Sequence, residues 1–303
     1  GYVVILTIDT EYMEISVDLK QFSSSELDRF SVAREFLWVG NPTASNAPRD
    51  RVVTNNLGYL LSQTIPVLIQ DGGLPESELK KSLKVVYEEF FTSVKARPNS
   101  KEKRYNEILD VDRLGMQVGV SEIVEMARRG EMEVKKVPGA LADRVSECIC
   151  ADKGIPAKQI CLYALSLNGK GIWECEAYRE YLYSKLVEEV FATTKMSKCH
   201  LCGADAEVTY DTSKFKLMKF YITDKVNFSY GIAKKEEGFW NTYAMCRDCY
   251  FYLLCGETFV RNKLRTHLAM STVYVIPEFH FPIGIPKDKM EKWAGYILSL
   301  IHI

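Results

Sequence analysis

The sequence CHLCG at residues 199–203 and the sequence CRDC at residues 246–249 decide how the second half of this chain can fold. Each contains a Cys-x-x-Cys pair, and two such pairs can hold one Zn²⁺ ion in a tetrahedron of thiolates. Gly203 permits the tight turn that points backbone amides toward sulfur. Four thiolates leave no open position for substrate, so we expect a structural ion and not a catalytic one. The predicted ligands are Cys199, Cys202, Cys246 and Cys249.

The residues around the two pairs predict the remaining elements of a zinc-finger domain. The pattern indicates strands over residues 206–210 and 214–221, and residues 250–264 have helical character. This order of knuckle, hairpin, knuckle and helix is typical of a treble-clef or ribbon-like finger. Residues 203–245 separate the pairs, which is more than the roughly 15–20 residues of a compact ribbon. The finger must therefore carry an insertion.

The predicted insertion interleaves lysines with aromatic residues. Lysine can neutralise phosphate and an aromatic face can stack on a base, so one interpretation is contact with nucleic acid. The other is an ordinary two-sided strand with its aromatic residues inward and its lysines in water. On the first interpretation, the candidate DNA-binding lysines are Lys216, Lys219 and Lys225.

The preceding region mixes strand and helix patterns. Residues 3–8 and 13–19 predict a β-hairpin, and Ser23 with Glu26 has capping-box spacing before a helix. Further helical patterns cover residues 54–69, 75–94, 146–167 and 174–196, with a break near Gly154.

These patterns predict an α+β protein in three parts. Residues 1–196 form a mixed α/β N-terminal region, residues 197–268 the inserted four-Cys zinc finger, and residues 269–303 a strand with the start of a helical region. The chain begins with Gly1 and stops at Ile303 inside a helical pattern, so we expect a fragment of a longer protein.

Composition excludes several classes of protein. The 303 residues are 47% hydrophobic, which excludes global disorder, and their net charge of −1 argues against a free-standing DNA-binding protein. No apolar run reaches the roughly 18 residues that a membrane helix needs, so we expect no membrane association. The nine cysteines do not resemble a secreted disulfide framework, and we expect reduced thiols in a cytoplasmic protein.

A polar segment near the N-terminus is the second candidate for DNA contact. GNPTASNAPRDR at residues 40–51 has no apolar periodicity and predicts an exposed loop. Asparagine can donate and accept at base edges, arginine can contact phosphate or guanine, and a helix start offers free amides to phosphate. An ordinary polar loop is the alternative. The candidates are Asn41, Asn46, Arg49, Arg51 and Asn55.

The order of four segments carries a family resemblance. CHLCG is followed by KFKLMKFYITDKVNFSYG, then by FWNTYAMCRDC, then by LLCGETFVRNKL. This order resembles the large subunit of type I-B CRISPR interference complexes, called Cascade, in which a split four-Cys zinc site flanks a segment of the form fY.tDk..f. WVGNP at residues 38–42, followed by Thr54 and Asn55, is similar to that family's N-terminal region. The matching residues of the central segment are Phe220, Tyr221, Thr223, Asp224, Lys225 and Phe228.

The resemblance implies a function without catalysis. A subunit of this kind helps to recognise the protospacer-adjacent motif in duplex DNA and supports R-loop formation, while base pairing of the guide supplies most of the sequence specificity. The implied partners are other Cascade subunits, crRNA, target double-stranded DNA and a recruited nuclease-helicase. The nuclease-helicase would cut the DNA, so this chain need not be an enzyme.

Two alternatives remain open. Asp9 and Glu11 follow an apolar strand, as in the first motif of DEDD-type exonucleases, where carboxylates bind two metal ions. A convincing set of further acidic partners is missing, and a hairpin turn with solvated acids explains the pair better. The other alternative is a zinc-stapled protein-interaction module that has no role with nucleic acid.

Overall fold

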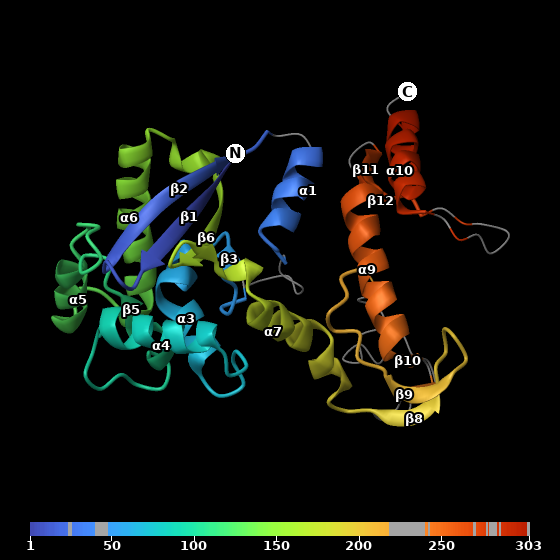
Figure 1. Ribbon diagram of the computed structural model, residues 1–303, viewed down its shortest axis with the longest axis horizontal. Helices are drawn as coiled ribbons and strands as arrows, with labels where there is room; N and C mark the ends of the chain where they lie inside the picture. The colour runs from blue at the N-terminus through green and yellow to red at the C-terminus, as the bar shows by residue number, and fades with distance from the viewer. Residues whose placement is uncertain are drawn as a thin grey trace. The chain divides into compact units, whose positions relative to one another are not determined.

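The computed structural model describes residues 1–23, 26–39, 48–217, 240–241, 243–268, 271–276, 278, 284 and 286–301. Over these residues the chain divides into two compact units, Gly1–Tyr183 and Ser184–Ile303 (Figure 1). Both units combine helices and strands, which confirms the predicted α+β class.

The first unit is a mixed sheet with helices packed around it. Its strands are β1 (Tyr2–Asp9), β2 (Glu14–Gln21), β3 (Val53–Thr54), β4 (Phe91–Ser93), β5 (Glu107–Leu109), β6 (Ile160–Leu167) and β7 (Lys170–Gly171). Its longer helices are α1 (Glu26–Glu35), α3 (Ile65–Ile69), α4 (Glu78–Phe90), α5 (Val120–Arg128), α6 (Val137–Lys153) and α7 (Glu176–Leu186), which crosses into the second unit. Its short helical turns are α2 (Leu57–Tyr59), η1 (Leu60–Thr64), η2 (Lys103–Tyr105), η3 (Val134–Lys136), η4 (Ala157–Gln159) and η5 (Ile172–Glu174).

The sheet joins the N-terminal hairpin to a strand far along the chain. Its order is β2-β1-β6-β3, with β7 paired to β6. β1 and β2 are antiparallel, with Asp9 opposite Glu14, which confirms the predicted hairpin. β1 and β6 are parallel, with Ile8 opposite Leu167. Because β1 has a neighbour on each side, its apolar residues enter the main core of the unit.

Helix α6 shows where the sequence-based prediction was right and where it was wrong. Leu141, Val145 and Ile149 repeat at helical spacing and are buried. Gly154 adopts a φ of 65°, the left-handed conformation that ends helices, so the helix predicted over 146–167 stops there. Residues 160–167 form β6 instead. This strand is buried along most of its length, and its nearly continuous apolar run cannot be told from a helix by periodicity alone.

The helical segment predicted over residues 54–69 is confirmed from Leu57 to Ile69, whereas Thr54 belongs to β3. The Asn56 side chain accepts a hydrogen bond of 3.1 Å from the Tyr59 N–H and caps α2. The chain then widens into the π-helical turn η1 before it returns to α-helical geometry in α3. Isolated π-helical turns occur frequently at functional sites.

The second unit is a small sheet followed by a long helix. Its strands are β8 (Lys195–Lys198), β9 (Asp205–Thr209), β10 (Met245–Cys246), β11 (Arg265–Leu268) and β12 (Ser271–Tyr274). Its helices are η6 (Glu188–Phe191), α9 (Arg247–Lys263) and α10 (Lys287–Ile301). Strands β8, β9 and β10 form one antiparallel sheet in the order β10-β9-β8.

Two sequence-based predictions for this unit need correction. The helix predicted over 174–196 ends at Leu186, and residues 195–198 form β8. The strand predicted over 214–221 is absent from its described part, because residues 213–217 form turns. The buried carboxylate of Glu257 explains these turns, since it accepts hydrogen bonds from the N–H groups of Lys216 and Leu217.

Candidate metal centre

In the second unit, one Cys-x-x-Cys pair lies in a turn between two strands, and the other lies where a strand passes into a helix. Cys199 and Cys202 occupy the turn between β8 and β9, where Gly203 adopts a φ of 74°. Cys246 ends β10, and Cys249 lies in the first turn of α9. Strand β9 connects the two places, because it pairs with β8 on one side and with β10 on the other. The order of knuckle, strand, knuckle and helix agrees with the predicted finger, but β9 pairs with β8 and β10 and not with the strand predicted over 214–221.

The four sulfur atoms are close enough to bind one ion. All four Sγ atoms lie within 4.8 Å of one another, and the Sγ atoms of Cys202 and Cys246 are 3.8 Å apart. A tetrahedron with metal–sulfur bonds of about 2.3 Å has sulfur–sulfur edges of about 3.8 Å. The cluster therefore fits a single tetrahedral ion, although Cys202 is exposed and Cys199 is buried.

His200 holds the first turn to the strand that carries the second pair. Its N–H donates to the Ala244 carbonyl at 2.9 Å, and its Nδ1 accepts from the Ala244 N–H at 3.2 Å. The Cys246 N–H also donates to the Cys199 sulfur at 3.3 Å. His200 is thus engaged with the backbone, and the group of possible ligands in the described residues contains cysteines alone.

The surroundings shift the pKa values of three of the thiols in different directions. Burial raises the pKa of Cys199, but hydrogen bonds to its sulfur from the N–H groups of Cys202, Cys246 and Leu201 outweigh burial and lower this pKa to about 6. Burial raises the pKa of Cys246 and that of Cys249, where the neighbouring thiols act in the same direction. Four thiolates in contact need a cation, so ion binding and proton release are coupled at this site.

An aromatic core packs behind the cysteines. Tyr250 is fully buried, and its ring meets those of Phe191 and Phe215 edge-on at centroid distances of 5.6 and 5.1 Å. The Arg247 guanidinium lies 5.0 Å from the centre of the Phe191 ring and pairs with Glu188. Cys199 and Cys246 belong to the same buried cluster. The ion site is therefore continuous with the core of this unit.

The four cysteines have the composition of a structural metal site. Four cysteines would fill the coordination shell of one ion and leave no position for a water or a substrate. Cys148, Cys150, Cys161 and Cys175 join no metal-binding group among the described residues. The arrangement can fix the strand turn and the start of α9 relative to each other.

Comparison with known protein families covers both units. Residues 1–184 match the N-terminal domain of CRISPR-associated protein TM1802, and residues 196–302 match the central domain of the same protein. The chain belongs to the CRISPR-associated TM1802 family. The two matched domains follow each other in the same order as the two units of the fold.

Other comparisons add no relative to this TM1802-family chain. No curated protein matches it, and no solved structure matches it. Within the residues that the structure describes, none of the helices has the length and apolar character needed to cross a membrane.

The structure places only some of the predicted DNA-contacting residues. Asn41, Asn46, Lys219 and Lys225 lie outside the described residues. Arg49 lies in a turn and is exposed, and Asn55 is exposed just before α2. The Lys216 backbone is held by Glu257 at 2.6 Å, and its side chain is half-buried. Arg49 and Asn55 belong to the first unit and Lys216 to the second.

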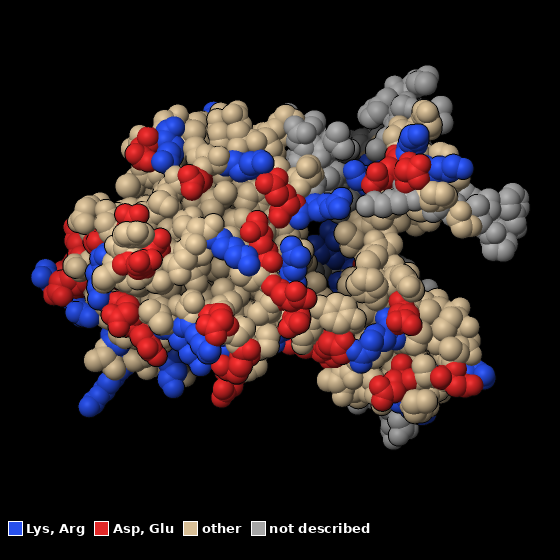
Figure 2. All heavy atoms as spheres, viewed as in Figure 1, with Lys and Arg blue, Asp and Glu red and all other residues tan. Residues whose placement is uncertain are grey.

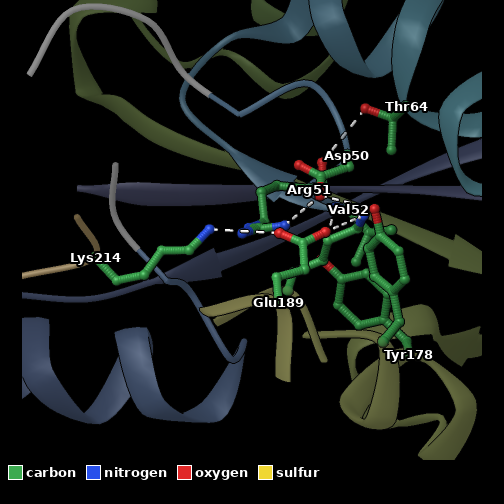
Figure 3. A network of polar contacts seen from close by, with 9 residues as sticks. Asp50, Arg51, Val52, Thr64, Tyr178, Glu189 and Lys214 are labelled. Atoms are coloured by element: carbon green, nitrogen blue, oxygen red, sulfur yellow. Dashed lines mark hydrogen bonds and ion pairs between the residues drawn. The ribbon is translucent and has the colours of Figure 1, made fainter. Parts of the chain in front are cut away.

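Arg51 has a structural role instead of the predicted surface role. Its residue is 6% exposed, and its Nη1 pairs with the Asp50 carboxylate at 2.6 Å (Figure 3). The Tyr181 hydroxyl donates to the same carboxylate at 2.8 Å, and the Val52 N–H donates to the Tyr178 hydroxyl at 3.1 Å. The guanidinium is therefore used inside the first unit, where burial keeps it from a phosphate.

The Asp9 carboxylate also accepts hydrogen bonds within its own turn. One carboxylate oxygen accepts from the N–H groups of Glu11 and Tyr12, both at 2.9 Å. Asn168 supports the same turn through a hydrogen bond of 2.9 Å from the Thr10 N–H. No third acidic residue joins Asp9 and Glu11 in a metal-binding group among the described residues. This geometry matches the hairpin-turn alternative for the pair.

Sequence reasoning missed two residues that shape the metal centre. One is His200, whose Nδ1 accepts from the Ala244 N–H and so joins the two halves of the site. The other is Glu257, whose carboxylate orders the turn that leads away from β9. An acidic residue inside an otherwise apolar helical face was the available signal for Glu257.

Proposed function

We propose that this protein is the non-catalytic large subunit of a type I CRISPR surveillance complex guided by crRNA. In this role it helps to recognise the protospacer-adjacent motif in duplex DNA and supports R-loop formation and recruitment of a nuclease-helicase. The guide would read most of the target by base pairing, and the protein would read the short flank.

The tandem match to two domains of one CRISPR-associated family carries this proposal. The closed four-Cys cluster and the engaged Asp9 carboxylate are consistent with a scaffold that leaves cleavage to another protein. A subunit inside a ribonucleoprotein needs basic surface only where it meets nucleic acid, which suits a net charge of −1.

We also propose that the ion in the four-Cys cluster is Zn²⁺. Zinc accepts four thiolates in a tetrahedron without a preference from d electrons, and the sulfur spacing fits its bond length. The ligands would be Cys199, Cys202, Cys246 and Cys249, and the ion would supply structure and no reaction step.

Co-expression with the neighbouring genes tests the functional proposal. The complex should copurify with a short guide RNA and bind a duplex that carries both a matching target and the correct flank. A duplex with a scrambled flank and a complex loaded with an unrelated guide are the controls. Guide-dependent and flank-dependent binding supports the proposal.

Two outcomes would contradict it. Absence of guide RNA and partner subunits from the purified protein leaves the zinc-stapled interaction module as the better account. Metal-dependent DNA degradation that an Asp9→Ala change abolishes would instead favour the nuclease.

A further inference from the structure

Two adjoining pockets on the first unit form a groove that includes none of the four clustered cysteines, although the predicted DNA contact Asn55 lines one of them. One has a volume of about 730 Å³ and the other about 720 Å³, and Tyr105 and Lys135 line both. The first pocket runs along residues 95–105 and the second between α2, η1 and the start of α6. We call this pair of pockets the Tyr105 groove.

The two halves of the groove differ in charge. Cationic side chains outnumber anionic ones in the first half, where Lys95 pairs with Glu102 at 2.9 Å and Lys135 with Glu133 at 2.7 Å. Lys101 and Arg104, both exposed, form no ion pair with the described residues. This half therefore keeps an excess of positive charge, although basic and acidic side chains are otherwise interspersed on the face seen in Figure 2.

The second half of the groove contains a polar side chain that has no hydrogen-bond partner among the described residues. Gln63 lines this pocket and is 3% exposed, and neither atom of its amide has a hydrogen-bond partner among the described residues. A buried amide without partners destabilises the fold, because it has lost its hydrogen bonds to water and gained none in return. Gln63 belongs to the π-helical turn η1, a type of turn found often at functional sites.

The start of α6 forms another wall of the second half. Pro138 and Gly139 line the pocket. The Val137 N–H already donates to the Val134 carbonyl and Pro138 has no N–H, so the first two residues of the helix offer no free amide. A side-chain carbon built on Gly58 would lie 3.0 Å from the Pro138 carbonyl oxygen, so glycine lets α2 approach α6 this closely. The charge of Lys135 at this wall suits a phosphate, although the Asp143 carboxylate also lines this half.

Aromatic rings complete the groove. Tyr59 and Tyr163 line the second half, and Tyr105 stands where the halves meet. The Arg104 guanidinium already lies 4.5 Å from the centre of the Tyr105 ring, so one face of this ring accepts a flat cationic group. Nucleobases stack on such rings in the same manner.

We propose that the Tyr105 groove binds a short single-stranded segment of nucleic acid with one unstacked base. The base enters the second half, where the Gln63 amide can donate to and accept from its edge. One phosphate lies between Lys135 and the start of α6, and the following phosphates lie along Lys101 and Arg104. This inference deepens the proposed function, because it rests on nucleic acid being the ligand, and it names a site for an unpaired strand.

The test uses the 303-residue chain with fluorescein-labelled ten-nucleotide homopolymers of each base, read by fluorescence anisotropy at several salt concentrations. A double variant, Lys101→Ala with Arg104→Ala, should weaken binding of all four homopolymers about tenfold at low salt. Its slope of log affinity against log salt should fall by about 1.4, because two phosphate contacts are lost. Lys84→Ala with Lys158→Ala, exposed lysines outside the groove, is the matched control.

Two single variants separate stacking from edge recognition. Tyr105→Ala should weaken binding about tenfold for every base, with Tyr12→Ala as the control on an exposed tyrosine. Gln63→Met keeps the volume and removes the amide, so it should preserve folding and reduce the preference among bases about fivefold or more. Retention of that preference would overturn the role of Gln63.

Failure of this inference can be told from failure of the proposed function. The anisotropy test needs neither guide nor partner, so an absent complex does not affect its result. Equal weakening by the groove and control pairs, or no binding to any homopolymer, overturns the groove. Groove variants that bind oligonucleotide normally but lose a partner subunit would also overturn it, and would assign the groove to a protein.

Discussion

Val3, Val4 and Leu6 are fully buried in the core of the first unit, whereas the core of the second unit includes two of the four clustered cysteines. The first core gathers residues from both strands of the N-terminal hairpin, from β6 and from several helices. The second core is much smaller and is continuous with the candidate metal centre. Small units bury a lower fraction of their surface and often need a metal or a disulfide to stay folded. The comparison predicts that the two units respond differently to the same perturbation.

Loss of one metal ligand is the strongest test of this difference. Cys246→Ser should lower bound zinc below about a tenth of an equivalent and unfold the second unit, because structural zinc contributes on the order of 10 kcal/mol in small fingers. Elemental analysis measures the zinc, and limited proteolysis with mass spectrometry maps which unit becomes cleavable. The first unit should stay protected.

Cys255→Ser is the matched control for that experiment, since Cys255 is an exposed thiol on the same helix as Cys249. It should leave both metal content and protection unchanged. If Cys246→Ser exposes both units to protease alike, the proposed independence of the first unit is wrong.

A cavity in the core of the first unit should destabilise that unit and leave the second unit unaffected. Leu83 on α4 is fully buried, and Leu83→Ala should lower the free energy of unfolding of the first unit by about 2–5 kcal/mol. Calorimetry should show its transition at a lower temperature while zinc content stays at one equivalent. Val85 on the same helix is 46% exposed, so Val85→Ala should change little. Loss of zinc from Leu83→Ala would mean that the units unfold together.

A smaller effect is expected from a helix cap in the first unit. The Asp112 carboxylate accepts hydrogen bonds from the N–H groups of Val118, Gly119 and Val120 at 2.7, 3.2 and 2.6 Å. Asp112→Ala should cost about 1–2 kcal/mol, because these amides lose their acceptor at the start of α5. Hydrogen exchange should become faster at residues 118–120. Unchanged protection there, beside an unchanged melting temperature, would show that solvent replaces the carboxylate.

The smallest effect is expected from the hydrogen bond that His200 accepts at the metal centre. His200→Ala removes the acceptor of the Ala244 N–H but none of the four sulfur ligands, so zinc should remain at one equivalent. Release to a chelator should be faster by about fivefold, as expected for the loss of roughly 1 kcal/mol of hydrogen bonding. Loss of zinc to half an equivalent or less would show that the imidazole is itself a ligand.

Sequence reasoning found the features that depend on short spacing. The four cysteines were predicted as one site, and their sulfur atoms lie together. The hairpin of β1 and β2 was predicted because β2 has one solvated face, and its pattern therefore alternates. Such features depend on residues that are close together in the sequence, so they can be predicted before the fold is known.

Features that depend on distant contacts were missed. β6 was predicted as helix, because the environment that makes it a strand comes from β1 at the other end of the unit. Arg51 was predicted on the surface, but Asp50 and the tyrosines of α7 enclose it. The unsatisfied amide of Gln63 carries no signal in sequence, since its lack of partners exists only after folding.

The parallel pairing of β1 with β6 also sets an order of events during synthesis. Tyr2 to Ile8 are made long before their partners, Ile160 to Leu167, which come near the end of the first unit. Until then the hairpin of β1 and β2 presents an unpaired apolar edge, the kind of edge on which nascent chains associate wrongly. Such long-range pairing slows folding. Translation rate and chaperone access while residues 2–167 are made should therefore affect the yield of this protein.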